Sequence, residues 1–258
     1  QINIRHLLTH SSGLKPFKEF FKMDPLPEYD DIIEEIIKSE IDFIPGTEYQ
    51  YSDLGMIILS EIIKKVDGRS LDKLAYLWFY KPLSMYSTMY NPNIGFSERI
   101  VPTEIDKIYR KRLLKGEVHD ENAHLLGGVS GHAGLFSTAN DVGKFAQMML
   151  DGGIWKGKRY LNQDQITDYT KVQNLPNGSE RTLGWDTPSQ NGKSSAGDFF
   201  SNLTYGHLGF TGTSLWIDPE NKLVVVLLTN RVHPTRDKVG IYGIRREFHT
   251  EIAKALIN

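Results

Sequence analysis

The hydrophobic pattern of the chain changes its period about two-thirds of the way along the sequence. Up to about residue 175, apolar residues recur at helical spacing, as in DDIIEEIIKS, whose paired isoleucines fall on one face. Capping residues such as Ser70, and the stop residue Gly68, mark where some of these segments begin or end. Helices are therefore expected over 30–39, 56–68, 70–83 and 138–149, and just after Asn162.

The last third of the chain has the pattern of short strands. Three apolar runs are separated by turn residues, and a helical pattern over GIRREFHTEIAKAL (243–256) closes the chain. The strands are expected over 203–210, 212–219 and 222–230. This order predicts an α/β (α+β) fold, with a mainly helical lobe over 1–175 and an antiparallel sheet flanked by a C-terminal helix over 176–258.

Composition excludes several classes of function. The 258 residues carry a formal net charge of −2, so no nucleic-acid partner is expected, and the one basic run, YRKRLLK (109–115), is expected to be a solvated helix face or loop. The absence of cysteine excludes disulfides, thiolate metal sites and a cysteine nucleophile. The longest aliphatic run, LVVVLL (223–228), is too short to span a membrane, so no span is expected in this chain.

Four segments together resemble the β-lactamase-related serine hydrolases, which include class C β-lactamases, penicillin-binding D-peptidases and esterases. They are HLLTHSSGL (6–14), PGTEYQYSDLGMIILSEII (45–63), GGVSGHAGLFSTANDVGKFAQMML (127–150) and GHLGFTGTSLWIDP (206–219). The resemblance covers nearly the whole chain. It implies a β-lactamase/transpeptidase-like fold and acyl transfer through an acyl-enzyme, with a Ser-x-x-Lys nucleophile, a tyrosine and donors for the oxyanion.

By this resemblance Tyr51, in Tyr51-Ser52-Asp53, matches the tyrosine of the Tyr-x-Asn motif and would act as general base. A free phenol has a pKa of about 10, so the role requires nearby cations. The alternative is a half-buried tyrosine that packs at a helix entry. Asp53 stands where many members carry asparagine, and an ionised carboxylate only accepts hydrogen bonds. This difference favours esters or specialised peptides over β-lactams, and Asp53 is also a candidate helix cap.

His207-Leu208-Gly209 matches the position of the family's Lys-Thr-Gly motif on a strand beside the site. His207 would bind the substrate carboxylate or support the tyrosine, and Gly209 would allow close approach of the substrate. The N–H of Phe210 would be one oxyanion donor. A purely structural histidine in a strand is the alternative.

No plausible nucleophile is found within the sequence. Ser12-Gly13-Leu14-Lys15 is followed by Pro16, which disfavours a helical Lys15, and Ser70-Leu71-Asp72-Lys73 follows Tyr51 in the wrong order for the family. We therefore expect the N-terminal part of the catalytic domain, with its Ser-x-x-Lys, to lie outside these residues, and the chain alone to be inactive. The alternative is a non-catalytic, degenerate or fragmentary module of the same fold.

The remaining histidines are given structural roles or left open. His6 and His10 are read as packing and loop anchors, whereas His119, Asp120 and His132 could border the substrate cleft. No metal site and no cofactor are expected. The sequence over 116–138 is also similar to domains fused to family-3 glycoside hydrolases in some bacteria. This similarity and the family suggest a small ester, peptide or cell-wall-derived substrate, a possible upstream glycoside hydrolase, and a periplasmic or other extracytoplasmic location.

Overall fold

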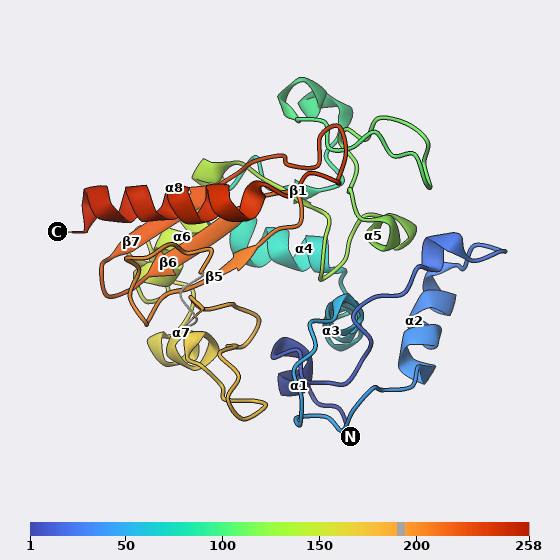
Figure 1. Cartoon of the computed structure of the whole chain (residues 1–258), viewed down its shortest axis with the longest axis horizontal. Helices are drawn as coiled ribbons and strands as arrows, with labels where there is room; N and C mark the ends of the chain where they lie inside the picture. The colour runs from blue at the N-terminus through green and yellow to red at the C-terminus, as the bar shows by residue number, and fades with distance from the viewer. Residues whose placement is uncertain (190–193, 258) are drawn as a thin grey trace. The chain divides into compact units, whose positions relative to one another are not determined.

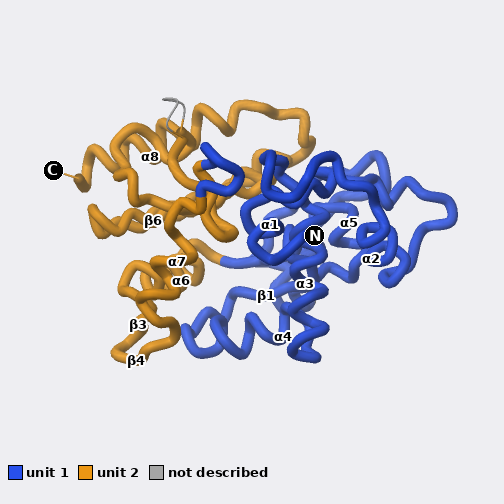
Figure 2. The backbone as a smooth tube through the Cα atoms, turned by 90° about the horizontal axis from the view of Figure 1, so that it is seen from below, with its two compact units in different colours: residues 1–137, 174–179 blue, residues 138–173, 180–258 orange. Residues whose placement is uncertain are grey.

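The computed structural model describes residues 1–189 and 194–257 and consists of two compact units. Unit 1 comprises residues 1–137 and 174–179, and unit 2 comprises residues 138–173 and 180–258 (Figure 2). The units do not coincide with the division expected between residues 175 and 176. Residues 138–173 group with the sheet because the helix over Ala139–Leu150 packs against its strands.

Unit 1 is built mainly from helices, as the sequence predicts (Figure 1). Its α-helices are α1 (Ile4–Leu8), α2 (Tyr29–Lys38), α3 (Asp53–Asp67), α4 (Leu71–Ala75) and α5 (Glu121–Leu125). Shorter elements are the 3₁₀ turns η1 (Phe20–Lys22) and η3 (Ile94–Arg99), the π-helical turn η2 (Tyr76–Tyr80), and the antiparallel pair β1 (Met89–Tyr90) and β2 (Leu135–Phe136). The periodicity of the sequence did not predict this small sheet.

Helices α2 and α3 confirm the expected helices over 30–39 and 56–68. Helix α3 begins earlier than expected because Ser52 is its N-cap: the Ser52 side chain accepts a hydrogen bond from the N–H of Gly55 at 3.1 Å. The helix ends at Gly68, whose φ of 83° lies in the left-handed region that favours glycine.

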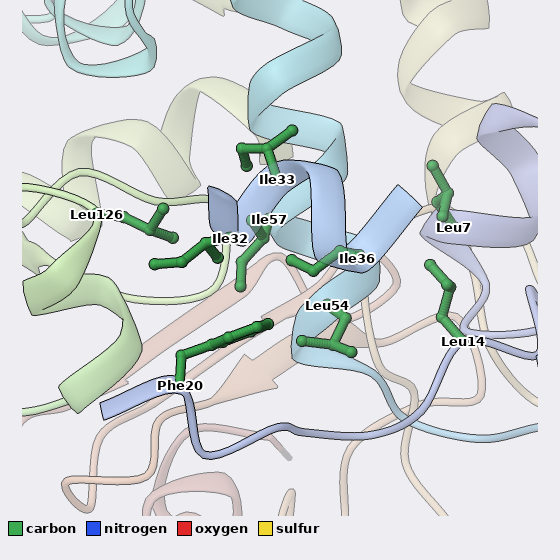
Figure 3. Close-up of a cluster of buried hydrophobic side chains, with 9 residues drawn as sticks. All are labelled: Leu7, Leu14, Phe20, Ile32, Ile33, Ile36, Leu54, Ile57 and Leu126. Carbon is green, nitrogen blue, oxygen red and sulfur yellow. The ribbon is translucent and has the colours of Figure 1, made fainter. Parts of the chain in front are cut away.

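The core of unit 1 lies where the apolar faces of α2 and α3 meet (Figure 3). Its buried side chains come from both helices, from α1, η1 and α5's end, and from the loop after α1: Leu7, Leu14, Phe20, Ile32, Ile33, Ile36, Leu54, Ile57 and Leu126. Full burial of one such side chain stabilises the fold by roughly 1.5–3 kcal/mol. Leu54 and Ile57 of α3 belong to this core, so packing of the α2 and α3 faces holds the N-terminal end of α3 in position.

The helix expected over 70–83 is interrupted. Ser70 is the N-cap residue of α4 by backbone conformation, but its side chain makes no capping hydrogen bond. The helix then widens into the π turn η2, where the N–H of Lys81 donates to the carbonyl of Tyr76 at 2.9 Å.

Unit 2 contains a three-stranded antiparallel sheet in the order β5 (Tyr205–Leu208), β6 (Ser214–Asp218), β7 (Leu223–Leu227), which confirms the three expected strands. Its helices are α6 (Ala139–Leu150), α7 (Gln163–Thr170) and α8 (Ile241–Leu256), and a small hairpin pairs β3 (Ile154–Trp155) with β4 (Lys158–Arg159). The turn after β6 is organised by the carboxylate of Asp218, which accepts hydrogen bonds from the N–H groups of Glu220 and Asn221.

Helices α6 and α8 lie on opposite faces of the sheet (Figure 1). Side chains alternate between the faces along β6, so Ser214 and Trp216 share one face. The Ser214 hydroxyl contacts Nε2 of His249 on α8 at 2.9 Å, whereas α6 packs along β6 and β7. Both Trp216 and His249 are almost completely buried, so neither side chain is accessible to solvent between the sheet and α8.

Candidate active site

Tyr51 lies immediately before α3 and is 40% exposed. His10 contacts it from the loop after α1: the two ring centroids are 4.1 Å apart at an interplanar angle of 31°. The N–H of Ser52 donates to Nδ1 of His10 at 3.1 Å, and the N–H of Gln50 donates to the carbonyl of His10 at 2.8 Å. The tyrosine is thus held between two residues that are both bonded to the same histidine.

Two further contacts fix the chain just after Tyr51. The Ser52 hydroxyl donates to the carbonyl of Lys15 at 2.7 Å, and the N–H of Asp53 donates to the carbonyl of Pro16 at 2.9 Å. The loop over 10–16, part of the HLLTHSSGL segment and its continuation, therefore serves as the support for the Tyr51 motif. A tyrosine packed at a helix entry and an accessible phenol are both compatible with this geometry.

Asp53 is the first residue of α3 and is half-buried. The suggestion that it caps the helix is wrong, because Ser52 occupies the cap and bonds Gly55. Burial raises the pKa of the Asp53 carboxyl, the nearby charge of His132 opposes this, and the charge of Asp120 adds to it. The carboxyl therefore takes up a proton more readily than an exposed aspartate.

His132 and Asp120 form a hydrogen-bonded group beside Asp53. Nε2 of His132 lies 2.9 Å from Oδ1 of Asp120, and Nδ1 lies 2.8 Å from the hydroxyl of Ser130. Burial raises the pKa of Asp120, but its hydrogen bonds to His132 and to the N–H of Ala123 outweigh this and lower it overall. From the sequence, His132 and Asp120 were only candidates to border the substrate cleft, and their hydrogen bond to each other and their influence on Asp53 were not predicted.

In unit 2, His207 lies on β5 opposite Leu215 of β6. Its Nδ1 donates to the carbonyl of Leu208 at 2.9 Å, which assigns the ring proton to Nδ1 in the neutral form. Burial lowers the pKa of His207, so the neutral ring is favoured. In this form Nε2 carries a lone pair and can accept a hydrogen bond.

Gly209 begins the turn between β5 and β6. Its N–H donates to the carbonyl of Thr213 at 2.8 Å, and a Cβ at this position would lie 2.1 Å from Oγ1 of Thr213. A side chain at 209 would therefore require the Thr213 hydroxyl to move. The buried guanidinium of Arg245, on α8, donates to the carbonyls of Gly209 and Thr213 at 2.6 and 2.7 Å.

Phe210 follows on the same turn and is exposed. Nε of Arg231 donates to its carbonyl at 2.7 Å, and the Arg231 guanidinium lies 4.2 Å from the centre of its ring. Two arginines, Arg231 and Arg245, thus hold the carbonyls on either side of the Phe210 N–H. Neither arginine could be predicted from the motif, since each lies more than 20 residues from it.

Neither of the two Ser-x-x-Lys strings combines a helical serine with a buried lysine. Gly13, between Ser12 and Lys15, has a φ of 80°, so this string is not helical, and Ser12 is buried with its hydroxyl accepting from the N–H of Leu14. Ser70 and Lys73 do lie one turn apart at the start of α4, but Lys73 is exposed.

Two further findings concern the described part of the chain. Over residues 1–189 and 194–257, no cluster of three or more histidine or acidic side chains is arranged to hold a metal ion. Within the same residues, no helix combines the length and apolar character needed to cross a membrane.

Comparison with known proteins gives the family. The model of the family described as Beta-lactamase matches residues 1–248. The chain belongs to the beta-lactamase family. The fold assignment from sequence, a mixed α/β fold of the β-lactamase/transpeptidase type, is therefore confirmed.

The curated relatives are named as an amidase and as carboxypeptidases. The chain is 36% identical to an N-acetylmuramyl-L-alanine amidase of Bacillus subtilis over 257 residues, covering 90% of this chain and 57% of the relative. It is 36% identical to a putative D-alanyl-D-alanine carboxypeptidase of Salmonella agona over 218 residues, covering 78% of this chain and 49% of the relative. The chain thus spans about half the length of the curated relatives it matches.

Solved structures show the same fold at lower identity. A penicillin-binding protein homologue from Caulobacter crescentus superposes with a TM-score of 0.72 at 16% identity, covering 99% of this chain and 71% of that one. The hydrolase EstCE1, described as having promiscuous acyltransferase activity, superposes with a TM-score of 0.69 at 18% identity, covering 100% and 72%. One of these structures is a penicillin-binding protein homologue and the other a hydrolase with acyltransferase activity, so the fold leaves the substrate open.

Within each unit the structure brings together the residues that the sequence selected. Tyr51 and Asp53 are neighbours at the start of α3 in unit 1, and His207, Gly209 and Phe210 are consecutive or nearly so in unit 2. Their catalytic and binding roles remain predictions.

Proposed function

We propose that this chain supplies the greater part of the catalytic domain of a serine hydrolase, which cleaves an ester or amide through a covalent acyl-enzyme. The observation that carries this proposal is the presentation of Tyr51. In a chain of the beta-lactamase family, a partly exposed phenol stands at the entry of α3 and is held by His10, Ser52 and their partners. Support of this kind suits a group that must meet a substrate in a fixed direction.

In this mechanism Tyr51 takes the proton of the attacking serine and later donates a proton to the leaving group. His207 is a neutral ring with its proton on Nδ1, so its Nε2 can accept a hydrogen bond. The N–H of Phe210 donates to the oxyanion, and the arginine contacts to the carbonyls of Gly209 and Phe210 keep that peptide unit in place.

The nucleophile is expected from a Ser-x-x-Lys outside these 258 residues, and the chain alone is expected to be inactive. The names of the two curated relatives favour a cell-wall-derived peptide or muramyl amide as substrate, with small esters as a second class. Such a substrate suits a periplasmic or other extracytoplasmic location. An upstream glycoside hydrolase domain would act on the same material, and we propose it on the sequence similarity alone.

The proposal is tested by covalent labelling with a fluorophosphonate probe. A longer natural chain that contains a Ser-x-x-Lys should be labelled, and the 258-residue chain should not. Tyr51→Phe in the longer chain should slow labelling by about 10²–10⁴-fold, because it removes a general base. Tyr86→Phe is the matched control, since Tyr86 is 71% exposed and lies outside the Tyr51 motif.

Labelling that is unchanged by Tyr51→Phe would remove Tyr51 from the mechanism. Failure of the longer chain to label would instead favour the non-catalytic module. Hydrolysis of D-alanyl peptides, muramyl-L-alanine, p-nitrophenyl esters and a chromogenic cephalosporin by the labelled chain would then identify the substrate class.

A further inference from the structure

His10 makes three contacts with the segment that carries Tyr51. Its carbonyl accepts from the N–H of Gln50 at 2.8 Å, its Nδ1 accepts from the N–H of Ser52 at 3.1 Å, and its ring lies 4.1 Å from the ring of Tyr51. The two hydrogen bonds bracket Tyr51 in the sequence. One residue, 41 positions upstream, therefore fixes both the backbone on each side of the phenol and one face of its ring.

The geometry also specifies the chemical form of the His10 ring. A backbone N–H can donate to Nδ1 only when that nitrogen carries a lone pair, so the ring is neutral and its proton is on Nε2. His10 is only 2% exposed, which keeps the ring in one orientation, whereas Tyr51 is 40% exposed. The buried ring of His10, held in one orientation, thus packs against the accessible ring of Tyr51.

Few other side chains could make the same set of contacts. Asparagine could place its Oδ1 near the position of Nδ1 but has no ring to pack on Tyr51, and phenylalanine has the ring but no acceptor. The backbone of His10 has a φ of 54°, a conformation that non-glycine residues adopt uncommonly and in which asparagine, aspartate and histidine are enriched.

We propose that His10 is the positioning residue for Tyr51: its neutral imidazole holds the backbone of Ser52 through Nδ1 and sets the direction of the phenol through ring contact. This inference rests on the proposed catalytic role of Tyr51. The hydrogen bond supplies the anchor, and the ring supplies the orientation. Loss of either one lowers turnover by misplacing the general base, without removing a substrate contact.

The anchor is tested first by hydrogen exchange at the Ser52 amide in the full natural protein, a measurement that needs no activity. His10→Phe should speed exchange about tenfold, because the amide loses its acceptor, whereas His10→Asn should keep it within about twofold of wild type. Unchanged exchange in a folded His10→Phe protein would overturn the anchor. If His10→Phe does not fold, exchange in His10→Ala gives the same comparison.

The orientation is tested by steady-state kinetics on the same proteins. Both His10→Asn and His10→Phe should lower kcat about tenfold and change KM by less than about twofold. His6→Asn is the matched control, because Nδ1 of His6 also accepts a backbone N–H, that of Asn3, at 3.3 Å, but its partner is not next to Tyr51. His6→Asn should leave kcat unchanged.

Wild-type kcat in folded His10→Asn would overturn the role of the ring. These outcomes are separable from failure of the proposed function. If Tyr51→Phe leaves labelling intact, the catalytic role of the phenol is wrong, whereas the exchange rates at Ser52 still report whether His10 anchors the segment.

Discussion

Two regions hold their candidate site residues in different ways. One is the Tyr51 corner of unit 1, which is the segment 50–53 with the loop 10–16 that supports it. The other is the β5–β6 turn of unit 2, residues 209–213. At the corner, support comes from loop residues far away in the sequence: Ser52 bonds His10 and Lys15, which lie 42 and 37 positions upstream. At the turn, support comes from the register of a sheet and from a buried arginine, Arg245. The corner depends on a few individual hydrogen bonds, whereas the turn depends on the folding of the sheet as a whole.

This difference implies that substitutions at the turn act mainly on stability and those at the corner mainly on geometry. The largest effect is expected for Gly206→Val on β5. A Cβ at this position would lie 2.0 Å from the carbonyl oxygen of Leu215 and 2.4 Å from the ring of Trp216. Unfolding by urea, followed by tryptophan fluorescence, should show a loss of about 3 kcal/mol or more, or no folded unit 2.

The control for this substitution is Gly143→Ala in α6, where a Cβ meets nothing within 4 Å. Alanine in a helix should leave stability unchanged or raise it by up to about 1 kcal/mol. A Gly206→Val protein as stable as wild type would show that the sheet adapts and that the comparison is wrong for the turn.

The next effect is expected for Arg245→Met. The change removes a buried charge-assisted donor and leaves the carbonyls of Gly209 and Thr213 without it, so the free energy of unfolding should fall by about 2–3 kcal/mol. Arg246→Met is the neighbouring control: Arg246 is partly exposed and pairs with exposed Asp198, so its loss should cost less than about 1 kcal/mol in thermal unfolding. Equal losses for the two arginines would contradict the special role of the buried one.

A smaller loss of stability is expected at the corner. Ser52→Ala removes the cap of α3 and the hydrogen bond to Lys15, and should cost about 1–2 kcal/mol. Ser60→Ala is the control, since the Ser60 hydroxyl only bonds the carbonyl of Ile57 within the same helix. If the geometry of the Tyr51 corner depends on individual hydrogen bonds, Ser52→Ala should also lower kcat. The loss of kcat should exceed what the fraction of unfolded protein explains.

The smallest effect is a dependence on pH at Asp53. Burial raises the pKa of Asp53 above its unfolded value, so the folded state holds more protons as the group titrates and stability falls as pH rises through that range. Asp53→Asn should therefore gain stability relative to wild type on going from acid to neutral pH.

Asp218 provides the opposite sign. Burial opposes ionisation there, but hydrogen bonds from Ser201 and Asn221 outweigh it and lower the pKa of Asp218. Its contribution is present above the unfolded pKa and is lost as pH falls, so Asp218→Asn should be destabilised at neutral pH and approach wild type in acid. Urea unfolding of both variants across this range checks the two signs, and equal signs would refute the assignment.

The elements with strong periodicity could be predicted from the sequence, and those formed by distant contacts could not. The isoleucine faces of α2 and α3 and the three strands of unit 2 follow from local patterns. The π turn η2 and the pair β1–β2 depend on contacts that no local pattern encodes. Arg110, expected in a solvated basic run, has a side chain only 5% exposed because it bonds Asp106 and the carbonyl of Val118.

In the candidate site, too, residues in local motifs could be predicted and partners brought in by distant contacts could not. Tyr51, Asp53 and His207 were identified because they lie in short contiguous motifs that resemble those of the family. Their neighbours include His10 beside Tyr51 and His132 near Asp53, while Arg245 bonds the carbonyl of Gly209, and each reaches its partner across a long loop or from another element. Such partners depend on tertiary folding, so a single sequence shows the residue types but not the pairing.

The close approach of Gly131 to α3 has a consequence for the design of variants around Asp53. A Cβ at residue 131 would lie 2.2 Å from the carbonyl oxygen of Met56, so the loop that carries His132 rests directly on the backbone of the helix that begins at Asp53. A side chain at 131 would push this loop away from α3 and disturb the position of His132, which bonds Asp120. A mutant library aimed at Asp53 can therefore vary His132 itself, but it should keep glycine at 131, since variants there would report loop displacement as if it were a change in specificity.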